Sequence, residues 1–136
     1  MLPFNEVDLS AVLGASVVCM VIGSLWYSPL LFGNTWMNLV GLNKEHCQNP
    51  TRAFGLCFVA TLVSIFVLAL LLALLVPLGL EDGLLFGGLL WVGIAAPIHL
   101  GPVIWQGKDI KLFWIGSLEN LLCILLSVAI LMEWPW

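Results

Sequence analysis

Charged side chains are scarce in this sequence. Asp, Glu, Lys and Arg make up 9% of its 136 residues, whereas a soluble domain carries roughly a quarter. Because so few polar side chains cannot cover a water-facing surface, a soluble globular domain is excluded. The four Lys and Arg residues form no basic patch, so we expect no binding to nucleic acid.

The sequence also lacks the motifs of common chemistries. It has no glycine-rich phosphate loop, no nucleophile elbow and no paired zinc motif. His46 and Cys47 are adjacent, but no second pair follows at ligand spacing, so we expect no metal site and no cofactor. The four cysteines fall in apolar or cytoplasmic segments, where disulfides are not expected. We therefore do not expect an enzyme.

Long apolar runs are abundant. Hydrophobic residues make up 62% of the chain, and its mean hydropathy is +1.12. Four segments, 7–27, 53–76, 83–104 and 110–132, are close to the ~20 residues that cross a bilayer core. Because backbone groups in lipid must be satisfied within their own segment, these are helices. The sequence predicts an all-α fold, a four-transmembrane-helix bundle that forms one membrane domain over residues 1–136, with the lipid bilayer as its main partner.

The few charges indicate how the bundle is oriented. All basic residues lie in or beside two connections, 28–52 and 105–110: Lys44, Arg52, Lys108 and Lys111. The acids at the other helix ends are Glu6, Asp8, Glu81, Asp82 and Glu133. Basic loops stay in the cytoplasm. We expect both connections to be cytoplasmic and both termini to lie outside the cell membrane.

The connection between the first two helices is itself partly apolar. Ser28-Pro29 interrupts the first helix, and apolar residues recur at helical spacing over 32–42. This pattern predicts a short helix in the membrane interface between helices one and two, with an irregular loop as the alternative. Trp26, Tyr27 and Trp36 are expected to anchor the chain at that surface.

Small residues mark the surfaces on which the helices pack. In the first helix they recur every four positions, and the third helix opens with a Gly-x-x-x-Gly pair: Ala11, Ala15, Cys19 and Gly23, then Gly83 and Gly87. Such stripes let helices approach closely in lipid. They could pack within one chain, in a homo-oligomer or in a larger membrane complex. The short connections predict that helices two and three, and helices three and four, are antiparallel neighbours.

Glu119 is the one carboxylate inside the fourth apolar segment. Ionisable groups at membrane depth are costly and usually face protein or water. Gly116, Asn120, Cys123 and Ser127 share its helix face, so this face should point into the bundle. His99 in the third helix is the expected partner, because both residues are ten positions from Asp109. Asn120 and Tyr27 complete the candidate polar site.

Two prolines flank His99. Pro97 and Pro102 remove helical donors and free carbonyl groups in the preceding turn. A broken helix beside an ionisable pair can form a polar pocket, although a proline can also simply bend a helix. The Glu119–His99 pair therefore has two interpretations: a site for a proton or a small solute, or interhelical contacts that fix the register of the bundle.

The chain also resembles a known family. The run Leu25-Trp26-Tyr27-Ser28-Pro29-Leu30-Leu31-Phe32-Gly33, with later matches at 89–93, 107–108 and 111–113, is similar to a bacterial membrane family, domain of unknown function 1761. The resemblance implies a small four-helix protein of the bacterial inner membrane and implies no activity. In the fourth helix, the family's Asn followed by an aromatic residue is replaced here by Glu119-Asn120.

These observations lead to three hypotheses. The first is a non-enzymatic protein that acts through helix packing, as a homo-oligomer or an accessory subunit. The second is a proton-coupled transporter or channel for a small solute, built around Glu119 and His99. The third is a membrane enzyme that uses the same two residues as acid and base.

Overall fold

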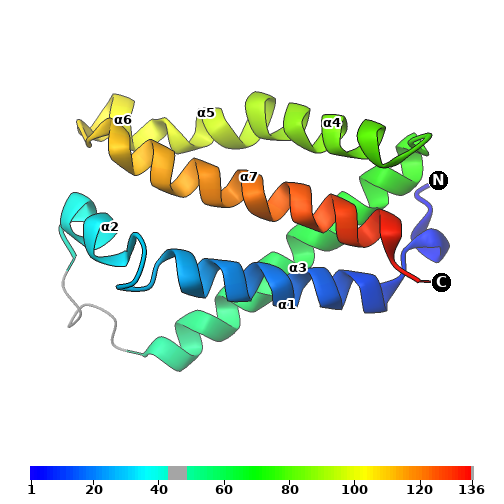
Figure 1. Cartoon of the computed structure of the whole chain (residues 1–136), viewed down its shortest axis with the longest axis horizontal. Coiled ribbons are helices and arrows are strands. Elements are labelled where there is room, and N and C mark those ends of the chain that lie inside the picture. The colour runs from blue at the N-terminus through cyan, green and yellow to red at the C-terminus, as the bar shows by residue number, and fades with distance from the viewer. Residues whose placement is uncertain (43–48, 136) are drawn as a thin grey trace.

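The computed structural model describes residues 1–42 and 49–135, and it is all-α in these residues, as predicted (Figure 1). Lys44, His46 and Cys47 lie outside them. The elements in chain order are η1 (Phe4–Glu6), α1 (Leu9–Trp26), α2 (Gly33–Val40), α3 (Pro50–Leu75), α4 (Leu80–Leu90), the π-helical turn η3 (Trp91–Ala95), α5 (Ala96–His99), α6 (Gly101–Gln106) and α7 (Ile110–Glu133).

Four helical stretches are long and apolar enough to cross a membrane. They are α1, α3, the nearly continuous stretch Leu80–Gln106, and α7. Side chains of Asp8, Asn49 and Asp109 cap the main-chain N–H groups at the starts of α1, α3 and α7. At Asp8, hydrogen bonds from the Ser10 hydroxyl and from nearby main-chain N–H groups lower the pKa of the carboxyl below its ordinary value of 3.8.

The four stretches pack in the order α3, α1, α7 and α4. Figure 1 shows α4, α5 and α6 along one side of α7, α1 along the other, and α3 crossing α1 obliquely. The expected pairing of the third and fourth spans is confirmed, since α4 to α6 all contact α7. The expected pairing of α3 with α4 is wrong. Their short connection joins only the helix ends, and the glycine face of α4 packs on α7 instead.

The small residues lie at these helix contacts. Ala11 and Ala15 of α1 are buried, and Cys19 approaches the Ser127 hydroxyl of α7 at 3.3 Å. Ideal Cβ atoms on Gly83 and Gly87 of α4 would press on α7 side chains, including Val128 at 3.1 and 3.2 Å. Within one chain, therefore, these stripes face neighbouring helices.

A cluster of buried apolar residues lies at the end of the bundle that holds the termini. Its members come from α1, α3 and α7: Ala11, Val12, Ala15, Cys19, Ile65, Leu68, Ala69, Leu72, Val128 and Leu131. Toward the other end, burial is concentrated on α7, at Phe113, Ile115 and Ser117. Toward the other end α3 diverges from α4–α6 (Figure 1), and residues 51–57 at its start are all exposed. The molecule thus has a tightly packed half and an open half.

The segment between α1 and α2 is closely folded. The Phe32 N–H donates to the Trp26 carbonyl, and the Gly33 N–H donates to the Ser28 carbonyl, both at 3.0 Å. Tyr27 meets Trp36 edge to face, with ring centroids 5.5 Å apart. The predicted helix is confirmed as α2, and its place at the membrane surface stays a prediction. The fold of this segment directs the Tyr27 side chain into the open half of the molecule.

Candidate functional site

The open half contains a cavity of about 880 Å³ between α1, α3, η3–α5 and α7. A volume of this size is typical of sites for small organic molecules. All four predicted polar residues line it: Tyr27 from α1, His99 from α5, and Glu119 and Asn120 from α7. Among these four, the cavity brings together side chains that are up to 93 positions apart in the sequence (27 to 120).

Glu119 lies about 14 Å along α7 from the start of the helix, at 1.5 Å per residue. The thiol of Cys123, one turn later, donates a hydrogen bond of 3.2 Å to a carboxylate oxygen of Glu119. On the facing helix, an ideal Cβ on Gly23 would lie 3.6 Å from the same oxygen. Gly23 of the α1 stripe thus leaves open space in front of the carboxylate.

His99 reaches α7 at Gly116, one turn before Glu119. An ideal Cβ on Gly116 would lie 3.1 Å from Nδ1 of His99 and 3.9 Å from the Tyr27 hydroxyl. The absence of a side chain at Gly116 thus makes room for both groups. In residues 1–42 and 49–135, no hydrogen bond or ion pair joins His99 to Glu119, although both face one cavity. Their equal separation from Asp109 stays a prediction of equal depth; the contact that His99 makes with α7 is at Gly116.

The cavity contains an acceptor without a partner. The side-chain oxygen of Asn120 is buried and has no hydrogen-bond partner among the described residues. The hydroxyls of Ser24, Thr61 and Ser64 on the cavity wall donate to carbonyl groups four residues earlier in their own helices. These hydroxyl hydrogens are therefore already in hydrogen bonds and do not reach Asn120. A buried acceptor without a donor lowers the stability of the fold.

Among the described residues, no Lys or Arg side chain compensates for the charge of Glu119. Within the described part of the chain, neither Lys nor Arg lines the cavity. Lys108 reaches instead toward the Val40 carbonyl, at 3.4 Å, near the end of α2. The described residues also contain no group of three His, Cys, Asp or Glu side chains that could hold a metal ion. The site consists of one carboxylate, one imidazole and several neutral polar groups.

Residues 10–132 match the model of the family described as protein of unknown function (DUF1761). The chain belongs to this family. No curated protein and no solved structure matches it. The DUF1761 match covers α1 to α7 almost completely, and therefore every residue of the cavity.

Two tryptophans from the segments that resemble the DUF1761 family hold α7 beside the site. The indole N–H of Trp26 donates to the Ile115 carbonyl at 2.9 Å, and that of Trp91 donates to the Ser117 carbonyl at 2.7 Å. These two carbonyl groups flank Gly116, so α1 and η3 are hydrogen-bonded to α7 on both sides of the residue that His99 contacts. Trp26 thus forms a hydrogen bond to another helix, in addition to the anchoring at the membrane surface that the sequence predicts.

Sequence reasoning missed the roles of Cys123 and of the two indoles. The i, i+4 spacing of Glu119 and Cys123 did signal that the two side chains could meet on one helix face. The indole contacts left no comparable signal, because a tryptophan near a helix end resembles any interfacial anchor. Their acceptors are main-chain carbonyls, which no residue pattern identifies.

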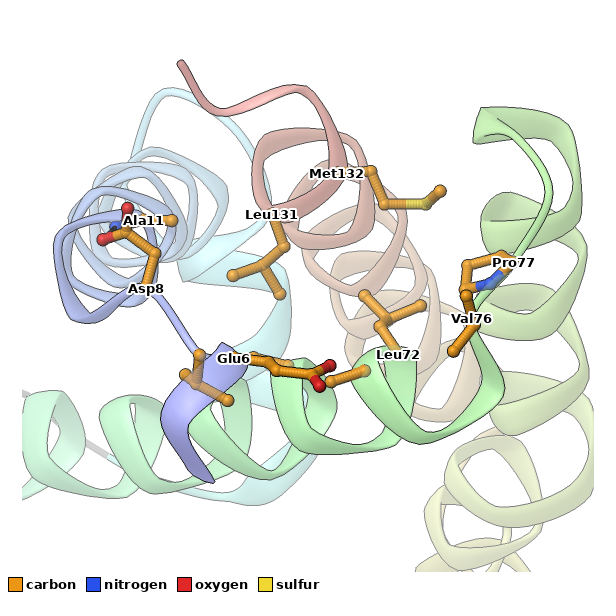
Figure 2. Close-up of a pocket in the computed structure, with 11 residues that line it drawn as sticks. Glu6, Asp8, Ala11, Leu72, Val76, Pro77, Leu131 and Met132 are labelled. Atoms are coloured by element: carbon orange, nitrogen blue, oxygen red, sulfur yellow. Dashed lines mark hydrogen bonds between the residues drawn. The ribbon is translucent and has the colours of Figure 1, made fainter. Parts of the chain in front are cut away.

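A second cavity, of about 460 Å³, lies at the terminus-bearing end, between the start of α1 and the ends of α3 and α7. Leu72 and Leu131 project into the space between the helices (Figure 2). In the described part of the chain, Glu6 and Asp8 are the ionisable groups that line it, and Asp8 already caps α1. This cavity lacks converging polar groups from several helices, so the cavity at Glu119 is the candidate site.

Proposed function

We propose that this chain is a non-enzymatic integral membrane protein that binds a small solute in the cavity at Glu119 and carries it in exchange for a proton. The observation that carries the proposal is a carboxylate inside a cavity of about 880 Å³, between helices long enough to span a bilayer. Ionisable residues at membrane depth usually belong to ion or substrate pathways. Contacts that only fix helix register would need no such volume.

The neighbours of Glu119 suit a site that gains and loses a proton. Besides Glu119, the described titratable groups that line its cavity are Cys19 on α1, Tyr27 at the end of α1, Cys57 on α3, Cys123 on α7 and His99 on α5. His99 lies about one turn closer to the end of the bundle that carries Arg52 and Lys108. It is therefore placed to pass protons between Glu119 and that end of the protein.

The positions of the helix ends also support an orientation of the protein in the membrane. The α6–α7 turn and the start of α3 lie at one end of the molecule, and both termini lie at the other (Figure 1). The described basic residues are at the first end: Arg52, Lys108 and Lys111. By the positive-inside rule, we assign this end to the cytoplasm of a bacterial cell and both termini to the outside of its inner membrane.

Proton movement in liposomes tests the proposal. Purified protein is reconstituted with a pH-sensitive dye inside, and anionic, neutral and cationic small solutes are added outside in turn. We expect at least one class to produce a proton flux that Glu119→Gln abolishes and His99→Ala slows. Glu133→Gln is the matched control, since this carboxylate lies at the far end of the same helix and outside the cavity. If no class produces a flux that depends on Glu119, the proposal fails.

A second candidate function is packing in a larger assembly, as a homo-oligomer or an accessory subunit. One observation favours it: residues 51–57 at the start of α3, which include Phe54 and Leu56, are all exposed. Another helix could fill this side of the cavity. Oligomer size in detergent, compared between wild type and Leu56→Glu, tests this; a monomer in both would exclude a homo-oligomer.

A further inference from the structure

The geometry points to a protonated amine with an apolar body as the solute that occupies the Glu119 cavity. This inference rests on the proposed function and deepens it, because it names the chemical class of the solute. Three independent features of the cavity support it: its charge, the weak hydrogen bonding of its acceptors, and the apolar walls on its open side.

Charge is the first feature. When Glu119 gives up its proton, the site carries a negative charge with no Lys or Arg among the described residues that line it. Of the other titratable groups in the described lining, Cys19, Cys57, Cys123 and Tyr27 can only become anions. His99 alone can become a cation, and it has no hydrogen bond to Glu119 in the described residues. A carboxylate at membrane depth needs a counter-charge. A cationic solute supplies it as the proton leaves.

Hydrogen bonding is the second feature. Glu119 and Asn120 are adjacent on α7, and both residues line the cavity. The Asn120 oxygen is itself buried, so its amide must rotate to accept a hydrogen bond from a solute. The carboxylate accepts from a thiol, which is a weak donor, and the Asn120 oxygen accepts from nothing in the described residues. An ammonium group offers two or three N–H donors to such a pair. A quaternary ammonium ion carries the same charge and offers none.

Size and wall chemistry are the third feature. A cavity of about 880 Å³ is far larger than a proton or a bare metal ion requires. Away from Glu119 its walls are mostly apolar, with Leu68, Leu71 and Leu90 among them. On the open side, Phe54 of α3 is 55% exposed and Ile98 of α5 is 69% exposed. In a bilayer this opening faces lipid, so a solute with an alkyl or aromatic body can enter from the membrane.

Binding of three matched probes tests the inference. Octylammonium, octyltrimethylammonium and 1-octanol share one alkyl chain and differ in charge and in N–H donors. Their affinities for purified wild type are measured by tryptophan fluorescence, and the protons released on binding by a pH-sensitive dye. We expect octylammonium to bind about tenfold or more tightly than either other probe and to release about one proton, which the cation replaces on Glu119.

Two variants separate the contribution of charge from that of hydrogen bonding. Glu119→Gln should remove the proton release and lower octylammonium affinity by about tenfold or more. Asn120→Ala should reduce the preference for octylammonium over octyltrimethylammonium and leave the proton release in place. Thermal unfolding of each variant shows that it is folded. The wild-type comparison needs no variant, so the inference can be tested even where a variant does not fold.

The outcomes distinguish this inference from the proposed function. Equal binding of all three probes, or tighter binding of 1-octanol, overturns the amine assignment. If anionic or neutral solutes drive a Glu119-dependent proton flux in liposomes while octylammonium does not, the amine assignment fails and the proposed function stands. If no solute drives such a flux and octylammonium does not bind, both fail.

Discussion

Replacing Gly33 by alanine tests how the segment between α1 and α2 is held. Gly33 is buried at the first position of α2, and an ideal Cβ there would lie 2.8 Å from the Ser28 carbonyl oxygen. It would lie closer still to the Tyr27 carbonyl oxygen. Carbon–oxygen contacts in proteins begin at about 3.3 Å. The main chain must therefore move by roughly half an ångström or more.

Two opposing energies decide the sign of the effect. Alanine favours a helix over glycine by up to about 1 kcal/mol. Forcing extra atoms into a packed site costs about 1–3 kcal/mol, and the cost is at the upper end here because the obstacle is main chain. We expect Gly33→Ala to lower the free energy of unfolding by roughly 1–2 kcal/mol. Gly88→Ala is the control, because a Cβ on Gly88 would meet nothing within 4 Å.

Thermal unfolding in detergent, followed by tryptophan fluorescence, measures both effects. Gly33→Ala should unfold at a lower temperature than wild type, whereas Gly88→Ala should unfold at the same temperature or a higher one. Because the Gly33 segment also aims Tyr27 at the cavity, Gly33→Ala should weaken octylammonium binding as well. A Gly33→Ala protein that is as stable as Gly88→Ala would refute the argument from close main-chain approach.

Three further predictions concern other parts of the bundle. Gly87→Leu should destabilise the protein by about 1–3 kcal/mol, because Gly87 contacts α7, whereas Gly88→Leu should have little effect; unfolding temperatures compare the two. Trp91→Phe should lower the free energy of unfolding by about 1 kcal/mol, because it removes the hydrogen bond to α7. Trp105→Phe, at an exposed site, should leave the free energy of unfolding almost unchanged in the same assay. Capping hydrogen bonds lower the pKa of the Asp8 carboxyl in the folded state. Its ionised form therefore stabilises the fold above pH ~3.8, and this stability is lost as the pH falls through the folded-state pKa. Asp8→Asn should reduce that loss when the free energy of unfolding is measured from pH ~6 to pH ~2.

The sequence was sufficient to predict the class of fold because length and hydropathy constrain it strongly. An apolar run of about 20 residues has few options other than a helix in lipid. The polar face of α7 was also predictable, since helical spacing aligns Glu119, Asn120, Cys123 and Ser127 whatever surrounds them. All four line the same cavity in the structure.

The neighbours of each helix were harder to predict. A short connection keeps two helix ends together, yet it does not make their faces pack, and α3 packs on α1 rather than on α4. In lipid, hydrophobicity does not distinguish one helix face from another, so close-fitting small residues decide. The contact of His99 with Gly116 was hard to predict for a related reason. Counting residues from Asp109 assumes regular helices, whereas the third span breaks at residue 100 and residues 107–109 lie outside both helices.

The division of the bundle into a packed half and an open half explains how a site can exist in so small a protein. Four helices that packed along their whole length would leave no space at Glu119. The core of α1, α3 and α7 at the terminus-bearing end provides the stability. Trp26 and Trp91 hold α7 in position farther along, at the carbonyl groups of Ile115 and Ser117. With α7 fixed from two sides, α3 can diverge and leave room in front of the carboxylate.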